Sequence, residues 1–128
     1  MSNLKKLYFS VLVAALTSSM AFSASAATFS HAEVKAALDN TVLKVKESIT
    51  ALEKGAEQDT LTNLVSDARQ MQKDIENNDL EVKRQHAGKR LKTAWGALRD
   101  GDMQLAGESL KDALSRYEEM QRIYASSH

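Results

Sequence analysis

The stretch LKTAWGALRDGDMQLAGESLKDALSRYEEMQRIY, residues 91–124, decides the fold. It predicts one helix, a turn at Gly101, and a second helix that Asp102 caps. In the second helix the apolar residues alternate spacings of three and four, a pattern typical of a helix that buries one face. These residues are Met103, Ala106, Leu110, Ala113, Tyr117, Met120 and Tyr124. The stretch therefore predicts an αα-hairpin.

The same pattern occurs about 46 residues earlier in the chain. Ala97-Leu98 followed by Gly101 matches Ala51-Leu52 followed by Gly55. A single hairpin cannot bury its apolar face, whereas two hairpins packed together can. We therefore expect an all-α fold, an antiparallel up-down-up-down four-helix bundle built from two duplicated αα-hairpins.

The first hairpin carries recognisable start and stop signals. Ser30 and Glu33 form a capping box at the start of the first helix, and Gly55 stands where a helix-ending glycine belongs. We expect the second helix to start after Asp59 or Thr60, since either side chain can cap it.

The second hairpin begins less clearly. Residues 76–79 end the second helix and can cap the third, which is clear from Ala87 onward. Leu80 and Val82 cannot both face inward on one helix. At the end of the chain we expect residues 125–128 to fray.

Residues 1–26 have the pattern of a secretory signal peptide. Two lysines, Lys5 and Lys6, precede an apolar core of about ten residues, and Ala24-Ser25-Ala26 is a small-x-small cleavage pattern. The sequence therefore predicts export through the Sec pathway to the periplasm, with a mature protein that begins at Ala27 and is not held in the membrane.

The mature chain, residues 27–128, is one small domain of 102 residues. Its 15 basic and 17 acidic residues give a net charge near −2, which argues against a nucleic-acid partner. The absence of cysteine excludes thiolate metal sites, haem attachment through cysteine and cysteine nucleophiles. We expect a monomer or homodimer.

No residue pattern indicates catalysis. There is no Gly-x-Ser-x-Gly motif, no phosphate-binding glycine loop and no EF-hand pattern. The methionines of the mature chain, Met71, Met103 and Met120, and the aromatic Trp95 fall on the apolar stripes, which favours core positions. The chain is therefore not expected to be an enzyme.

Three histidines are the candidate metal ligands: His31, His86 and His128. His31 lies in the first turn of the expected first helix, and His86 lies beside the apolar stripe of the third. His128 is the last residue of the sequence. No His pair at i,i+4 and no Glu-x-x-His motif is present, so a ferritin-like di-iron site is not expected.

The mature chain resembles the small metal-binding protein family of exported four-helix bundles. The similarity lies in residues 30–38 (SHAEVKAAL) and in residues 89–116 with their Ala-Leu-x-x-Gly turn. The resemblance implies binding of a divalent metal such as copper or nickel through histidines repeated along the helices. This chain has three histidines, and the repeated array is missing.

A second resemblance, in size, topology and last hairpin, is to the periplasmic four-helix b-type cytochrome. That resemblance implies haem held by a Met near the start of the first helix and a His near the end of the fourth. This chain has no Met in its first helix, and the region from Met120 to Tyr124 stands where that His belongs. Haem is therefore not expected.

The expected function is binding or buffering of a divalent metal (copper, nickel or zinc) in the periplasm. His31 is the first candidate ligand, followed by His86 and His128, with Glu33 completing the shell. In an up-down bundle all three histidines lie toward one end.

Two alternatives stay open. One is a metal-free envelope interaction or stress protein, which an exposed apolar patch around Val82 and Ala97 would favour. The other is a bundle that holds haem or a small apolar ligand near Trp95, Met71 and Met120.

Overall fold

The computed structural model describes residues 31–127, so the predicted signal peptide, the predicted capping residue Ser30 and His128 lie outside the described residues. Within that range all regular structure is helical and no strand is present. The elements are α2 (His31–Glu53), α3 (Gln58–Gln72), the 3₁₀ turn η3 (Asn78–Leu80), α4 (Glu81–Asp100) and α5 (Met103–Ser127). Along this part of the chain, no helix combines the length and the apolarity that crossing a membrane requires. The predicted all-α class is confirmed.

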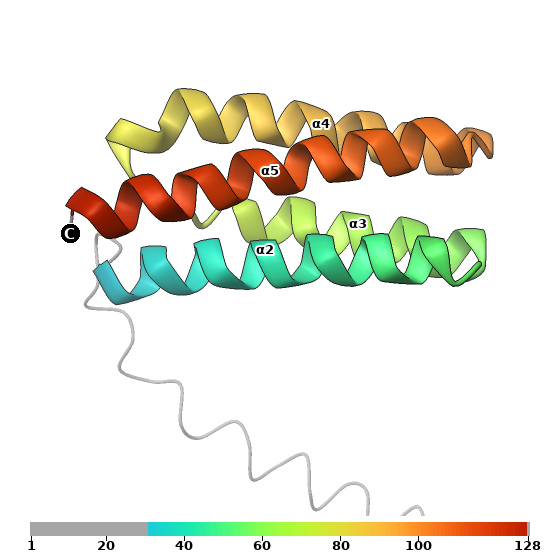
Figure 1. Ribbon diagram of the computed structural model, residues 1–128, viewed down its shortest axis with the longest axis horizontal. Helices are drawn as coiled ribbons and strands as arrows, with labels where there is room; N and C mark the ends of the chain where they lie inside the picture. The colour runs from blue at the N-terminus through green and yellow to red at the C-terminus, as the bar shows by residue number, and fades with distance from the viewer. Residues whose placement is uncertain (1–30, 128) are drawn as a thin grey trace, which may run out of the picture.

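The four long helices pack into one bundle. α2 contacts α3 and α5, and α4 likewise contacts α3 and α5, so the helices form a closed ring around a shared core (Figure 1). The start of α2 and the end of α5 lie at the same end of the molecule (Figure 1). His31, the first candidate metal ligand, is the first residue of α2 and therefore lies at this end of the bundle.

Apolar side chains from all four helices are buried in that core. The apolar stripe of α5 is buried from Ala106 to Tyr124, as its spacing predicts. Met103 is 38% exposed, so its predicted core position is wrong. Met103 is the first residue of α5, beside the Gly101 turn, where solvent reaches the end of the bundle.

Two glycine turns end α2 and α4 in the same way. Gly55 has φ 77° and Gly101 has φ 80°, the left-handed backbone that glycine adopts without steric cost. After α2, the amide of Ala56 donates to the carbonyl of Ala51 at 3.0 Å. After α4, the amide of Asp102 donates to the carbonyl of Ala97 at 2.8 Å. Both are Schellman motifs, so the repeated Ala-Leu-x-x-Gly sequence forms the same local structure twice.

The start of α3 differs from the prediction. α3 begins at Gln58, so Asp59 and Thr60 lie inside the helix, and no side chain caps it. The reason is tertiary: the Gln58 side-chain amide donates to the carbonyls of Leu98 and Arg99, the latter at 2.9 Å. Gln58 thereby gives the Arg99 carbonyl a donor at the end of α4, where a helix lacks internal donors, and adds a second donor to the Leu98 carbonyl beside the Gly101 amide.

The other helix ends agree with the sequence more closely. The Asn77 side chain accepts from the Asp79 amide at 2.9 Å and opens η3, while Asp102 accepts from the Leu105 amide at 3.0 Å and caps α5. Leu80 is 1% exposed and Val82 is 63% exposed, so only one of the two faces inward, as predicted.

The end of α5 is a correction. Residues 125–127 continue the helix, whereas the sequence predicted that they fray. The hydroxyls of Ser126 and Ser127 both donate to the carbonyl of Ile123, which satisfies a carbonyl group of the last turn.

Candidate metal site at the end of the bundle

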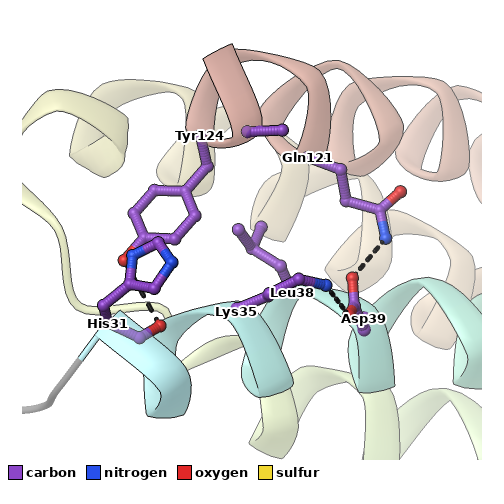
Figure 2. Close-up of a pocket in the computed structure, with 7 residues that line it drawn as sticks. His31, Lys35, Leu38, Asp39, Gln121 and Tyr124 are labelled. Carbon is purple, nitrogen blue, oxygen red and sulfur yellow. Dashed lines mark hydrogen bonds and ion pairs between the residues drawn. The ribbon is translucent and has the colours of Figure 1, made fainter. Parts of the chain in front are cut away.

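A hollow of about 340 Å³ opens between the start of α2 and the end of α5. We call it the His31 hollow (Figure 2). Its lining residues are His31, Lys35, Leu38, Asp39, Gln121, Tyr124 and Ala125. The i, i+4 and i+8 spacing of His31, Lys35 and Asp39 places them along one face of α2.

The His31 ring stacks on the Tyr124 ring. The ring centroids are 4.9 Å apart and the planes are 17° from parallel. The Tyr124 hydroxyl donates to the backbone carbonyl of His31 at 3.4 Å (Figure 2). Tyr124 is buried, whereas His31 is exposed. The buried tyrosine therefore ties the exposed histidine to the end of α5.

Asp39 connects α2 to α5 on the inner side of the hollow. Its carboxylate accepts from Lys35 Nζ at 2.7 Å and from Gln121 Nε2 at 2.9 Å (Figure 2). The Lys35 hydrogen bond lowers the pKa of Asp39, and the Gln121 bond adds to this against the opposing effect of burial. Asp39 is therefore an ionised carboxylate already engaged by two donors.

His31 and Asp39 start from well-separated positions of α2. His31 and Asp39 are eight residues apart on one helix, which separates their backbones by ~12 Å along its axis. A general base must lie within hydrogen-bond reach of its partner. The hollow thus combines an exposed imidazole with apolar and charged side chains.

Of the predicted ligands near His31, Glu33 is described and His128 lies outside the described residues. Glu33 is exposed and follows His31 by two positions in the first turn of α2. Two positions correspond to about 200° around a helix, so the two side chains leave α2 on different sides. His128 follows Ser127, the last residue of α5, directly in the sequence.

His86 lies elsewhere. It is exposed and lines a hollow of about 80 Å³ with Lys83, Arg116 and Glu119. Positions 116 and 119 of α5 are on a different side of that helix from position 124, which contacts His31. Within residues 31–127, no three His, Asp or Glu side chains are grouped so that they could hold a metal ion. The structure therefore does not bring His86 into the His31 hollow.

Sequence reasoning missed three residues of the hollow: Lys35, Asp39 and Gln121. Lys35 and Asp39 form an i,i+4 ion pair, which their spacing alone could have suggested. Gln121 is 82 residues from Asp39, and no local pattern in the sequence identifies that contact.

The two alternative binding regions differ from their predictions. Ala97 is 5% exposed, so it forms no surface patch with Val82. Trp95 is half-buried, and its ring is covered by the guanidinium groups of Arg69 at 5.3 Å and Arg99 at 4.9 Å. Met120 is fully buried in the core. The patch that would favour a protein-interaction role is therefore not formed by Val82 and Ala97, and Trp95 has cationic neighbours.

No protein-family model, curated protein or solved structure matches this chain. A function is therefore inferred from the geometry of residues 31–127 and from the sequence that directly adjoins them.

Proposed function

We propose that this chain is an exported, periplasmic helical-bundle protein that binds or buffers a divalent metal such as copper, nickel or zinc, and that it is not an enzyme. The proposed site is the end of the bundle where α2 begins and α5 ends. The observation that carries the proposal is the stacked contact of His31 with Tyr124, whose centroids are 4.9 Å apart.

This contact supports pairing of His31 with His128. Tyr124 is four residues before His128 in the sequence, and Ser127 adjoins His128 directly. Imidazole nitrogens suit copper, nickel and zinc. In the proposal, His31 and His128 supply the two protein nitrogens of the site.

The other candidates have lesser parts. Glu33 contributes negative charge near the ion rather than a bond, because its side chain leaves α2 on another side from His31. Asp39 stays with Lys35 and Gln121. His86 is given no part, because the neighbouring Lys83, Arg116 and other cations disfavour a metal cation there.

The proposal includes the architecture that brings the site together. We propose an antiparallel up-down-up-down bundle that arose by duplication of one αα-hairpin. Supporting the antiparallel order are the contacts of His31 with Tyr124 and of Gln58, at the start of α3, with Arg99, at the end of α4. Supporting the duplication are the two matching Schellman turns.

Calorimetric titration of the mature protein with Cu(II), Ni(II) and Zn(II) tests the function. We expect micromolar or tighter binding of at least one ion. His31→Ala and His128→Ala should each weaken it at least tenfold, which is about 1.4 kcal/mol. His86→Ala, the matched control, should change it less than twofold.

Two outcomes would remove the proposal. Heat that is equal in all three histidine variants would show binding unrelated to this site. The absence of heat with every ion would leave the metal-free envelope protein or a bundle for a small apolar ligand as the working function.

A further inference from the structure

A groove between α3 and α4 gathers cationic side chains. Its cavity is about 350 Å³. Its lining residues are Arg69, Gln72 and Lys73 of α3 and Arg84, Gln85, Gly88, Lys89 and Lys92 of α4. We call this the α3–α4 groove. Five of its eight lining residues are Lys or Arg, and none is Asp or Glu.

Many cations elsewhere on the described surface pair with carboxylates, whereas most of those in the groove do not. Lys35 pairs with Asp39, and Lys83 with Glu119 at 2.8 Å. Of the groove cations only Arg84 has a carboxylate partner, namely Glu81. No carboxylate in residues 31–127 forms an ion pair with the other four groove cations. Their positive charge is therefore not neutralised by the protein.

The floor of the groove is formed by Gly88 and Gln72. A Cβ atom at Gly88 would lie 3.4 Å from Gln72 Oε1, so the missing side chain leaves room for the glutamine amide. The Tyr117 hydroxyl, which lies in the buried core, donates to Gln72 Oε1 at 3.3 Å. Tyr117 thereby orients the amide and leaves its NH₂ group as a donor. The groove has positive walls and a neutral, donating floor.

Arg69 is held at one end of the groove by its position over the Trp95 ring, 5.3 Å from the centroid. Such cation–π contacts fix a guanidinium without neutralising its charge. Trp95 is the only tryptophan in the chain, so its fluorescence reports on the groove wall.

We infer that the α3–α4 groove binds a small soluble polyanion that carries two or more phosphate groups. Arginine forks donate to phosphate oxygens in pairs, and lysines act as point charges on the same groups. The groove is closed by helix on both sides, and its one nearby indole is already covered by arginines, so it lacks the stacking surface that single-stranded nucleic acid uses. This site is separate from the His31 hollow, since the two share no lining residue.

Titration of the mature protein with inorganic tripolyphosphate, in metal-free buffer at low ionic strength, tests the inference. Trp95 fluorescence and calorimetry are the readouts. The test variant is the double substitution Lys89→Gln and Lys92→Gln, which removes two positive charges from one wall while keeping side-chain length and helix propensity. We expect binding of the wild type and at least tenfold weaker binding of this variant.

The matched control is the double substitution Lys54→Gln and Lys111→Gln. Both lysines are exposed and lie outside the groove, and the change in net charge is the same. This control should bind tripolyphosphate within twofold of the wild type. His31→Ala should also leave it unchanged, which separates this result from that of the metal titration.

Three results would overturn the inference. One is no binding of tripolyphosphate by the wild type. Another is equal weakening in the two double variants, which would indicate general charge attraction. The third is tighter binding to vesicles of anionic phospholipid than to tripolyphosphate, because the occupant would then be a membrane surface and not a soluble anion.

Discussion

At the scale of single residues, two glycines of the α4 region have opposite roles. Gly101 has φ 80°, a conformation that costs an L-residue about 1 kcal/mol or more. Gly96 lies inside α4 at ordinary helical φ, and a Cβ there would have no neighbour within 4 Å. The two positions therefore form a matched pair for substitution by alanine.

We predict that Gly101→Ala lowers the free energy of unfolding by about 1 kcal/mol or more. Gly96→Ala should raise it by up to ~1 kcal/mol, because alanine has the higher helix propensity. Urea unfolding of both variants measures the difference. Effects of the same sign at the two sites would contradict the left-handed turn at Gly101.

Asp39 gives a prediction for pH. Its pKa in the folded protein is lowered by the Lys35 and Gln121 hydrogen bonds. A lowered pKa contributes stability that is present above the unfolded value, about 3.9, and is lost as the pH falls through the folded value. The side chain is partly exposed, so the contribution is about 0.5 kcal/mol.

Asp39→Asn should therefore be less stable than the wild type near neutral pH. The difference should shrink as the pH falls below about 4. Denaturant unfolding across this range measures it. Asp67→Asn, an exposed position of α3 without an ion pair among the described residues, is the control. A difference that stays constant in acid would exclude ionised Asp39 as the cause.

At the scale of helices, Gln58 is the residue that joins α3 to the end of α4. Its amide donates to the Leu98 and Arg99 carbonyls. Gln58→Ala should lower the free energy of unfolding by about 1 kcal/mol, because the Arg99 carbonyl loses the Gln58 donor and the Leu98 carbonyl keeps only the Gly101 amide. Gln104→Ala should cost less than about 0.5 kcal/mol, since the exposed Gln104 side chain hydrogen-bonds Glu108 of its own helix. Equal losses, measured by urea unfolding, would contradict the capping role of Gln58.

Some helix boundaries depend on residues nearby in the sequence, whereas others depend on contacts between helices. The glycine turns and the Asp102 cap were predicted correctly, because each depends on residues within one turn of the chain. The start of α3 was not predicted correctly, because the Gln58 side chain hydrogen-bonds to a backbone carbonyl 40 residues further along the chain. Trp95 was expected in the core, yet arginines from α3 and α4 cover it, and only the folded packing brings Arg69 there.

At the scale of the whole molecule, a net charge near zero does not mean that positive and negative side chains are evenly distributed over the surface. The 15 basic and 17 acidic residues of positions 27–128 suggest a surface of intermixed charges, and the ion pair of Lys83 with Glu119 agrees with that expectation. The α3–α4 groove does not fit it, since Lys73 and Lys89 belong to different helices that folding brings together. The amino-acid composition gives only total charge, so it cannot show that positive side chains gather on one surface of the folded protein.

For the candidate site, too, the sequence predicts local features, whereas contacts between helices appear only in the folded structure. The sequence identified His31 as exposed in the first helical turn, and this is confirmed. Its stacking on Tyr124, 93 positions further along the chain, depends on the packing of α2 against α5. The same packing places His86 on another side of α5, which leaves the His31 end as the proposed metal site.

Electron paramagnetic resonance of the Cu(II)-loaded mature protein tests this site most directly, because couplings from ligand nitrogens count the imidazoles bound to the ion. We predict couplings from two imidazoles in the wild type and in His86→Ala. Only one should remain in His31→Ala and in His128→Ala. A spectrum that is identical in all four proteins would contradict a copper site formed by His31 and His128.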